Sequence, residues 1–315
     1  MTGPVEGDTR TDAVTDGGAL PSAPAIPGLA VLTVAYRSGA CLPVLAADLA
    51  RQRRPPEHWI VVDNSPDSAP VELPALEGLR SRRVQGMEGA GFGDGCNRGF
   101  EALRGLGWGG WVWLLNPDIR LASGDELLDL LQALATLPAN AVVGTVVCDG
   151  EGGVEPSGGW LSDGLRFRGV TLQAQHQQAL APVAVDWLSG CSLALQPEAH
   201  RPPARFDPAF PLYYEDMDLC RRLAGQGAPL LWLPGIRVGH RRGSGSSTPE
   251  PRRLRLSTLG YLRYLRRHTP GWVMALRSAR LLLLSLLRLP WRPRRSLAVL
   301  AAMLEVLQDP EGCRG

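Results

Sequence analysis

The fold is decided by one short stretch, Ala30-Val31-Leu32-Thr33-Val34-Ala35, in which apolar and β-branched residues follow one another without a break. Such a run is typical of a strand that is covered on both faces of a sheet. The spacing of residues 41–52 predicts a helix, and Trp59-Ile60-Val61-Val62-Asp63 predicts a second strand. A strand, a helix and a second strand in this order predict a parallel sheet with a right-handed crossover.

The pattern continues along the chain. Trp111-Val112-Trp113-Leu114-Leu115 predicts a third buried strand, and residues 127–137 predict a helix that follows the capping-box pair Ser123 and Glu126. Residues 149–182 have a loop composition with room for short strands. Further regular segments are predicted over residues 141–147, over 185–195, after Glu215 and over 230–233.

The composition describes a globular protein, since the 315 residues are 44% hydrophobic and can form one large domain or two small ones. A formal net charge of only +2 argues against a general nucleic-acid binder. The six cysteines form no CxxC pair and no signal peptide is apparent, so we predict reduced thiols in a cytoplasmic protein. Residues 1–27 lack the large apolar side chains of a core and predict a disordered tail.

The C-terminal segment carries a strong local positive charge. Every basic residue of the chain is Arg, and twelve of them lie between Arg252 and Arg295, where no Asp or Glu occurs. Residues 254–307 predict two or three helices, and Arg residues interrupt their most apolar run before it reaches the ~20 residues of a membrane span. Arg beside Leu and Trp is typical of helices that lie on an anionic bilayer. An ordinary helical hairpin packed on the main domain, with Arg facing water, explains the pattern equally well.

Polar residues follow three predicted strands at their carboxyl ends, the edge at which open α/β sheets bind ligands. These residues are Tyr36-Arg37-Ser38, Asp63-Asn64-Ser65 and Asn116-Pro117-Asp118. An aromatic ring can pack on a base, and a carboxylate can accept a hydrogen bond from a base or a ribose hydroxyl. Together they predict a nucleotide site, although each triplet alone is also typical of a turn.

The glycine-rich stretch 89–99 lacks GxGxxG spacing and does not follow a strong strand, which disfavours a Rossmann dehydrogenase. Its glycines predict a flexible backbone that approaches a ligand closely. Asn97 and Arg98 would then hydrogen-bond or neutralise phosphate. A plain glycine-rich loop is the alternative.

Three carboxylates stand within four positions in Tyr213-Tyr214-Glu215-Asp216-Met217-Asp218, at a predicted helix start. When such groups are buried together they repel, so the pKa of at least one rises and one becomes suited to be a base or a metal ligand. A solvated helix N-terminus, where acidic residues are favourable, is the alternative.

Two further residues predict a divalent metal. Asp118 offers a carboxylate of the kind that joins diphosphate oxygens and water around Mg²⁺ or Mn²⁺. His240 is the second candidate ligand, against the more common structural role of a lone His. Arg241 and the Gly- and Ser-rich residues 242–247 that follow suit a mobile lid over a diphosphate.

Seven motifs, taken in order, resemble those of family 2 glycosyltransferases and most closely their rhamnosyltransferase-like branch. They are residues 31–38, Val61-Val62-Asp63-Asn64-Ser65, residues 91–99, Leu115-Asn116-Pro117-Asp118, Trp187-Leu188-Ser189-Gly190-Cys191, Phe206-Asp207 with residues 213–222, and Gly239-His240. The resemblance covers roughly residues 30–247. It implies a GT-A fold over residues 28–248, that is, an α/β domain with a Rossmann-like, mostly parallel central sheet flanked by helices. The tail 1–27 would precede this domain, and a basic helical extension, 249–315, would follow it.

The resemblance also assigns roles to the positions that match. Asn116 stands where the family's Asp-any-Asp motif has its first Asp, which leaves one negative charge fewer. The catalytic positions are Asp216, as the base, and Glu215 in support. The donor-binding positions are Thr33, Tyr36, Asp63, Asn97, Asn116 and Gly190, and the metal ligands are Asp118 and His240.

The function implied is inverting transfer of a sugar, with rhamnose as the example of this branch, from a nucleotide-diphosphate donor. The acceptor would be a hydroxyl of a saccharide or a lipid-linked molecule in cell-surface polysaccharide synthesis. The expected cofactor is Mg²⁺ or Mn²⁺, no nucleic-acid partner is expected, and the protein would be cytoplasmic or peripheral at the inner face of the plasma membrane. Two alternatives stay open: a nucleotidyltransferase acting on sugar phosphates, and a nucleotide-sugar-binding protein without turnover.

Overall fold

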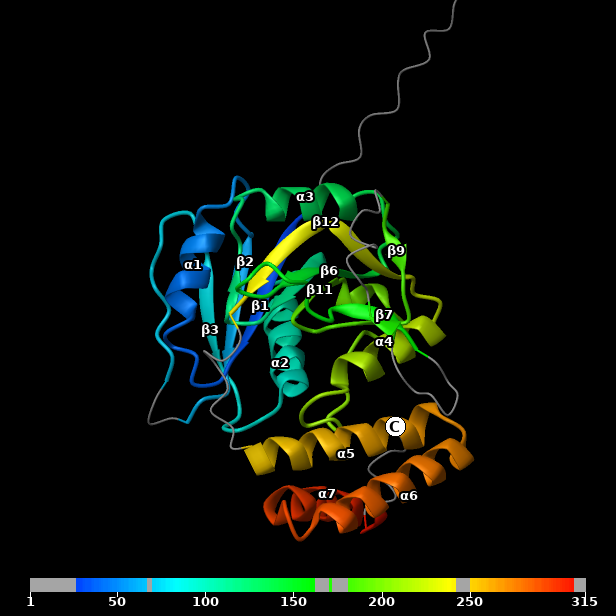
Figure 1. Ribbon diagram of the computed structural model, residues 1–315. Helices are drawn as coiled ribbons and strands as arrows, with labels where there is room; N and C mark the ends of the chain where they lie inside the picture. The colour runs from blue at the N-terminus through cyan, green and yellow to red at the C-terminus, as the bar shows by residue number, and fades with distance from the viewer. Residues whose placement is uncertain (1–26, 67–69, 162–169, 172–180, 242–249, 309–315) are drawn as a thin grey trace, which may run out of the picture.

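The computed structural model describes residues 27–66, 70–161, 170–171, 181–241 and 250–308. Within this part of the chain a central sheet carries helices on both faces, and three C-terminal helices form a further layer at one end (Figure 1). The predicted α/β fold with a mostly parallel sheet is therefore confirmed. The predicted lid, 242–247, and nearly all of the predicted tail lie outside the described residues.

The first strand, helix and second strand form as the sequence predicts. β1 (Leu29–Ala35) pairs in parallel with β2 (His58–Asp63), and α1 (Leu42–Ala50) connects them. Ala35 lies opposite Asp63 in this register, so the two strands end at the same edge of the sheet. Successive side chains of β1 enter different hydrophobic cores, because neighbouring residues of a strand point to opposite faces.

Each face of the sheet has its own core. Helices α1 and α3 (Glu126–Leu134) cover one face, and α2 (Phe92–Gly105) and α4 (Glu215–Gly225) cover the other. The predicted capping contact before α3 is present, since the Glu126 carboxylate accepts a hydrogen bond of 2.7 Å from the N–H of Ser123. The sheet is therefore buried on both sides, as its continuous apolar strands require.

The strand order creates a crevice at the carboxyl edge. Because β1 lies between β2 and β4 (Trp111–Leu115), the chain leaves the carboxyl end of β1 toward one side and that of β4 toward the other, which opens a ligand site between them. From one edge the strands are β3 (Ser81–Gln85), β2, β1, β4 (Trp111–Leu115), β11 (Ser192–Leu195), β6 (Val142–Cys148), β12 (Leu230–His240) and β5 (Ile119–Arg120).

One strand runs against its neighbours. β11 is antiparallel to both β4 and β6, so it begins at the edge where they and β1 end. Ser192 lies opposite Leu115, and the N–H of Asn116 donates to the carbonyl of Cys191 at 3.1 Å. The predicted regular segment 185–195 is thus two short strands, and the turn between them is placed at the crevice.

The last long strand delivers a histidine to the same edge. β12 is parallel to β6, with a change of register between Leu233 and Arg237. It continues to His240, well beyond the predicted residues 230–233. Its end pairs with β5, where His240 lies opposite Ile119. The residue before Ile119 is Asp118, so this pairing brings the two predicted metal ligands together.

Short elements complete the main body. The described part of the predicted loop region contains only short strands, and the five cysteines among the described residues are free. The elements are β7 (Gly158–Trp160), β8 (Val170–Thr171), β9 (Val183–Ala184), β10 (Trp187–Leu188) and a 3-10 turn over Pro197–Ala199.

The C-terminal residues form three helices, α5 (Glu250–His268), α6 (Gly271–Arg288) and α7 (Pro293–Gln308). Figure 1 shows α5 between the sheet-containing body and the other two helices. Among the described helices none is long and apolar enough to cross a membrane. Helix α5 therefore links the outer helices to the body that carries the crevice.

Candidate active site

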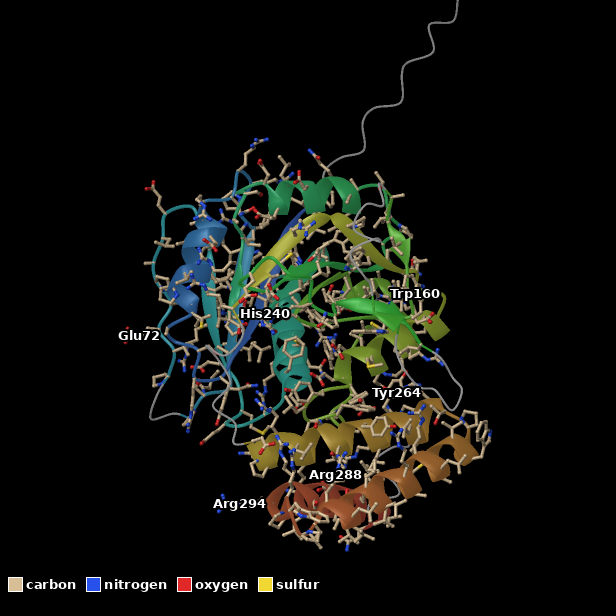
Figure 2. The ribbon with its side chains drawn as sticks, in the orientation of Figure 1. Glu72, Trp160, His240, Tyr264, Arg288 and Arg294 are labelled. Carbon is tan, nitrogen blue, oxygen red and sulfur yellow. The ribbon has the colours of Figure 1, made fainter. Side chains whose placement is uncertain are left out.

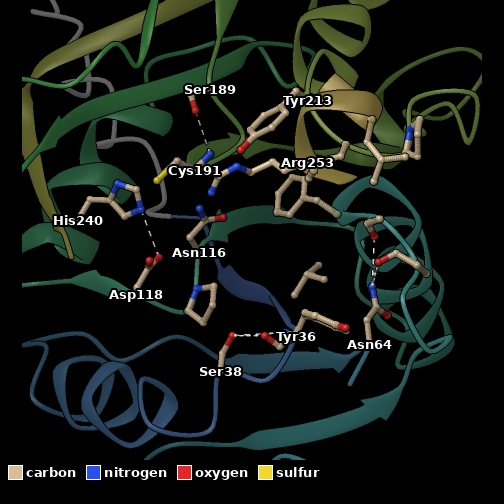
Figure 3. A pocket seen from close by; sticks show the side chains of 18 of the residues that line it. Tyr36, Ser38, Asn64, Asn116, Asp118, Ser189, Cys191, Tyr213, His240 and Arg253 are labelled. Carbon is tan, nitrogen blue, oxygen red and sulfur yellow. Dashed lines mark hydrogen bonds and ion pairs between the residues drawn. The ribbon is translucent and has the colours of Figure 1, made fainter. Parts of the chain in front are cut away.

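A cavity of about 730 Å³ lies at the carboxyl edge of the sheet, between the strand ends and the start of α5 (Figure 3). Part of its wall is the turn before β11, and part is the segment before α4. Polar side chains from all these segments line it: Tyr36, Ser38, Asn64, Asn116, Asp118, Glu155, Ser189, Tyr213, His240, Arg252 and Arg253.

Asp118 and His240 meet in this cavity, as the sequence predicts. Nε2 of His240 lies 3.3 Å from Oδ1 of Asp118, and its Nδ1 lies 2.9 Å from Oε2 of Glu155. Figure 3 shows the His240 ring turned toward the Asp118 carboxylate. The imidazole is thus held between two carboxylates.

The role of each ring nitrogen depends on the tautomer of His240. When Nδ1–H of His240 donates to Glu155, Nε2 of the neutral ring presents a lone pair to the Asp118 carboxylate. Two acceptors at 3.3 Å repel unless a proton or a cation lies between them. The hydrogen bond to Asp118, opposed by burial and assisted by Glu155, raises the pKa of His240 above its ordinary value. The pair therefore attracts positive charge.

A divalent cation fits this pair. Metal-binding histidines commonly hold their second ring nitrogen on a carboxylate, which is the arrangement of His240 on Glu155. Among the described residues no group of three His, Cys, Asp or Glu side chains surrounds a common point. The protein would therefore supply Asp118 and His240, and a bound diphosphate and water would supply the remaining ligands.

Glu155 is not among the site residues predicted from the sequence. The N–H of Glu155 donates to the carbonyl of Val147 at 2.9 Å, and Val154 bridges to Cys148, so the chain after β6 folds back along the end of that strand. A single Glu in a glycine-rich stretch has no informative spacing. Only the fold reveals that it supports His240.

Asp216 lies in the first turn of α4, next to the cavity wall. Its Oδ2 accepts a hydrogen bond of 3.0 Å from the N–H of Gly190, and its Oδ1 accepts one of 2.8 Å from the N–H of Met217. Ser189 and Cys191 on either side of Gly190 line the cavity, whereas Gly190 and Asp216 do not line it themselves. Asp216 is next to the wall through its hydrogen bond to Gly190. Burial raises the pKa of Asp216 against these two hydrogen bonds. A carboxylate with a raised pKa suits a general base.

Glu215 has a different position from its neighbour. Its side chain lies in the protein interior, with 7% of the residue exposed, and it does not line the cavity. Burial and the negative charge of Asp216 raise the pKa of Glu215. Glu215 is therefore placed to influence Asp216 rather than to touch a ligand.

The two residues before Glu215 hold an uncommon backbone conformation. Tyr213 and Tyr214 have φ angles of 62° and 69°, in the left-handed region that non-glycine residues rarely adopt. Helix α5 packs closely on them, since a Cβ on Gly260 would lie 2.6 Å from the carbonyl oxygen of Tyr213. Non-glycine residues in this conformation persist when their surroundings fix them, and such residues cluster at functional sites.

Asp218 faces away from the cavity and forms a buried ion cluster. It accepts hydrogen bonds from Arg222 at 2.7 Å, His268 at 2.8 Å and Arg267 at 3.1 Å. Burial alone would raise its pKa, but the bonds from His268 and Arg222 and the charge of Arg267 lower it overall. The contact with Arg222 is an i,i+4 ion pair within α4, and Asp218 additionally links α4 to α5 through Arg267 and His268.

Of the predicted donor-binding residues, Tyr36 and Asn116 line the cavity, but Thr33 does not. Thr33 is fully buried in β1, where its Oγ1 accepts a hydrogen bond of 3.1 Å from Nε1 of Trp59. Thr33 thus provides the hydrogen-bond acceptor for the buried indole N–H of Trp59.

Asp63 is also turned away from the cavity. Its carboxylate is fully buried and accepts hydrogen bonds from the N–H groups of Ser65 and Val71 and from the guanidinium of Arg83. Burial would raise the pKa of Asp63, but the hydrogen bonds, led by Val71, lower it. Asp63 thus orders the turn after β2, and its neighbour Asn64 reaches the cavity instead.

The glycine-rich stretch is not a flexible loop, because most of it is the start of α2. Its glycines permit close packing: a Cβ on Gly95 or Gly99 would lie within 2.5 Å of a β1 side chain. Asn97 bonds through both amide atoms to the backbone of Phe206, at 2.8 and 2.9 Å, and does not line the cavity. The predicted phosphate contact of Asn97 is therefore not supported.

Helix α5 contributes cations that the sequence analysis does not assign to the site. Arg252, Arg253 and Leu256 line the cavity from its first turns. Figure 3 shows the Arg253 side chain extending toward Asn116. Within the described residues Arg253 takes part in no ion pair. It was hidden among the twelve Arg of a segment that has no distinguishing spacing.

A nucleotide-sized cavity at the carboxyl edge of a mostly parallel sheet, with an Asp–His pair in it, agrees with the GT-A class of glycosyltransferase fold that the sequence predicts. The family model described as Glycosyl transferase family 2 matches residues 30–188, just over half of the chain. The chain belongs to glycosyl transferase family 2. This confirms the predicted family and argues against a nucleotidyltransferase.

Curated relatives and solved structures agree with this assignment. The chain is 27% identical over 236 residues to an N-acetylglucosaminyl-diphospho-decaprenol L-rhamnosyltransferase of Mycobacterium tuberculosis (strain CDC 1551 / Oshkosh), and the match covers 68% of this chain and 76% of the relative. The same values apply to the protein of that name from strain ATCC 25618 / H37Rv. The rhamnosyltransferase-like resemblance predicted from the sequence is thereby confirmed.

Two solved structures share the fold at low identity. Mannosyltransferase PcManGT from Pyrobaculum calidifontis, in complex with GDP-Man and Mn²⁺, has a TM-score of 0.53 at 13% identity and is matched over 90% of this chain and 88% of its own. GalNAc-T7 with UDP, GalNAc and Mn²⁺ has a TM-score of 0.51 at 14% identity, over 77% of this chain and 48% of its own. The chain thus spans about half the length of GalNAc-T7.

Proposed function

We propose that the protein transfers a sugar, with inversion, from a nucleotide-diphosphate donor to a hydroxyl of a lipid-linked saccharide in cell-surface polysaccharide synthesis. One observation carries the proposal: Asp118, His240 and Arg253 converge in one cavity, and Asp216 adjoins its wall. The relative's name, which describes an L-rhamnosyltransferase acting on a polyprenyl-diphosphate sugar, supports rhamnose and a lipid-linked acceptor.

The donor would lie across the crevice between β1 and β4. The Tyr36 ring at the end of β1 is placed to pack against the base, and the Asn116 amide is placed to accept or donate hydrogen bonds. These groups favour a nucleotide without fixing which base it carries. The diphosphate would then lie toward Asp118 and His240.

The diphosphate end of the cavity is suited to negative charge. Asp118 and His240 would hold Mg²⁺ or Mn²⁺, which when bound supplies charge neutralisation for the leaving diphosphate. Arg253 adds a guanidinium that can bond two phosphate oxygens at once. Asn116 provides no negative charge where the family has an Asp, so the metal would rely on Asp118 for its carboxylate. Arg253 would supply positive charge to the diphosphate independently of the metal.

Asp216 would act as the general base. Its raised pKa lets it accept the proton of the acceptor hydroxyl as that oxygen attacks the anomeric carbon. The Gly190 N–H holds one carboxylate oxygen and fixes the orientation of the group. Glu215 lies beside it in the interior, where burial and the charge of Asp216 raise the pKa of Glu215 to about 8.

A panel of dTDP-, UDP- and GDP-sugars, incubated with a polyprenyl-diphosphate saccharide acceptor, tests the proposal through release of the nucleoside diphosphate. We expect one donor, a dTDP-linked 6-deoxyhexose such as rhamnose, to be consumed only when the acceptor is present. Donor binding without turnover on any acceptor would instead identify a nucleotide-sugar-binding protein.

A further inference from the structure

Helices α6 and α7 leave a large apolar surface uncovered. Of the thirteen large apolar side chains that are exposed among the described residues, ten lie between residues 272 and 307, and Trp291 and Leu307 are 80% and 70% exposed. The ten, here called the apolar face, are Trp272, Leu276, Leu282, Leu283, Leu286, Leu287, Trp291, Leu297, Leu304 and Leu307. Exposed apolar side chains gathered on two neighbouring helices in this way indicate an interaction site.

The apolar face is additional to the packing that holds the helices together. On α6, Trp272, Leu276, Leu283 and Leu287 are separated by multiples of one helical turn and share one side of the helix. The inner side of the layer is already complete, since Leu259 and Leu262 of α5 pack with Ala302 and Val306 of α7. The face therefore has no partner within the described chain.

Positive charge surrounds the apolar face. Arg280, Arg288, Arg292 and Arg294 are exposed, and none of them takes part in an ion pair within the described residues. Figure 2 shows Arg294 projecting away from the body of the protein. The acidic residues of this layer are already used, because Glu305 pairs with Arg255 and Glu250 pairs with Arg295.

We infer that the apolar face and its four arginines form a peripheral docking surface for an anionic lipid bilayer. Leucine and tryptophan side chains would enter the boundary between headgroups and acyl chains, and the arginines would bind lipid phosphates. A second copy of this chain fits less well, because a two-fold interface would place the same uncompensated arginines opposite one another.

The docking surface also bears on the active site, in a step that depends on the proposed function. Helix α5 lines the cavity with Arg253 at one end and packs on α7 through Leu259 and Leu262. A bilayer against α6 and α7 would thus lie about one helix layer, or ~10 Å, from the element that forms the cavity wall. A lipid-linked acceptor could then reach the cavity while its lipid stays in the membrane.

Vesicle flotation of the full chain, without donor or acceptor, tests the docking surface separately from activity. We expect the protein to float with mixed phosphatidylcholine and phosphatidylglycerol vesicles and to remain unbound with phosphatidylcholine alone. Leu283→Glu with Leu287→Glu should weaken binding about ten-fold or more, because two side chains that enter the bilayer become charged. Replacing Arg280, Arg288, Arg292 and Arg294 by Gln should also reduce binding and remove its dependence on salt.

Matched controls come from exposed residues of the main body. Leu106→Glu and Arg104→Gln change the same residue types outside the helical layer and should float like the wild type. Equal flotation of the Leu283/Leu287 variant, or a wild type that stays unbound with anionic vesicles, would overturn the inference. So would a dimer in light scattering that the double variant converts to a monomer. Because no sugar donor is involved, failure here leaves the proposed transfer reaction intact.

Discussion

The first turn of α4 has two sides with opposite electrostatics. On the cavity side, Asp216 has only backbone N–H donors from Gly190 and Met217, and its pKa is raised. On the side packed against α5, Asp218 is held by Arg222, Arg267 and His268, and its pKa is lowered. The two residues are of the same type, and only Met217 separates them in sequence.

The difference shows that the surroundings of a side chain decide the role of two chemically identical carboxylates. A carboxylate that ion pairs hold in its charged form is a poor proton acceptor, whereas one that burial disfavours in that form accepts a proton readily. Asp218 therefore suits a structural role and Asp216 a chemical one. Sequence position alone does not distinguish them.

The largest expected effect is that of Asp216→Asn. If Asp216 is the base, this variant should bind donor normally and lose about 10²–10⁴-fold in transfer rate. Nucleoside diphosphate release measures the transfer, and calorimetric titration with the donor measures binding. Because proton acceptance requires the charged carboxylate, wild-type activity should rise with pH through the raised pKa of Asp216.

The neighbouring Asp218→Asn variant is the matched control, since it removes one carboxylate from the same turn. It should keep a rate within a few-fold of the wild type wherever it is folded, with the same dependence on pH. Near-normal transfer by Asp216→Asn would remove the base assignment. A large loss of transfer in folded Asp218→Asn would remove the contrast between the two sides.

For stability, we expect the larger effect from Asp218→Asn and the smaller one from Asp216→Asn. Asp218→Asn leaves Arg222, Arg267 and His268 without their shared anion and should lower the free energy of unfolding by about 2–3 kcal/mol. This is below the ~3–5 kcal/mol of fully buried pairs because Arg222 is partly exposed to solvent. Thermal or urea unfolding at neutral pH measures the change.

The pH dependence of that stability has a defined sign. The pKa of Asp218 is lower in the folded protein, so its contribution is complete above the unfolded value of ~3.9. The contribution is lost as pH falls through the folded value. The wild type and Asp218→Asn should therefore differ at neutral pH and converge in acid, and a constant difference would contradict the role of the charge.

Much of the fold follows from the sequence because it depends on local patterns. Continuous apolar runs identify buried parallel strands such as β1 and β4 without knowledge of the tertiary structure. The reversal of β11 does not follow, because the direction of a short strand depends on which neighbours it meets. That reversal is what places Gly190 beside Asp216.

A site residue is predictable from its motif only where no long-range contact gives its side chain another role. Asp118 and His240 lie in the cavity, as their motifs predict. The Thr33 hydroxyl instead accepts a hydrogen bond from Trp59, and the Asp63 carboxylate accepts one from Arg83. These contacts join different strands or distant turns, so no local pattern records them. Glu155 and Arg253 were missed for the same reason, because each reaches the cavity by long-range packing.

Glu155 allows the comparison to be extended to the metal pair. Glu155→Ala should weaken Mn²⁺ affinity about ten-fold, since the His240 ring loses the group that orients it. Glu155→Gln keeps an oxygen that can accept from Nδ1–H and should restore most of the affinity. Electron paramagnetic resonance of free Mn²⁺ in the presence of donor measures the change. Glu151→Ala, in an exposed part of the same loop, is the control, and an equal loss there would point to a general effect on the loop.

The last variant, Arg253→Gln, separates the roles of two arginines in the first turns of α5. Arg253 lines the cavity, whereas Arg255 two residues later pairs with Glu305 of α7 and does not line it. A charge-assisted hydrogen bond contributes about 1.5–3 kcal/mol, so loss of one to a diphosphate should raise the KM for donor roughly ten-fold. The effect is kept near that lower limit because Arg253 is partly exposed to solvent.

Arg255→Gln is the control. It should leave KM unchanged and reduce stability slightly, since its ion pair is also partly exposed. If both variants raise KM equally, α5 acts on the donor through its overall position, and Arg253 has no contact of its own with the diphosphate.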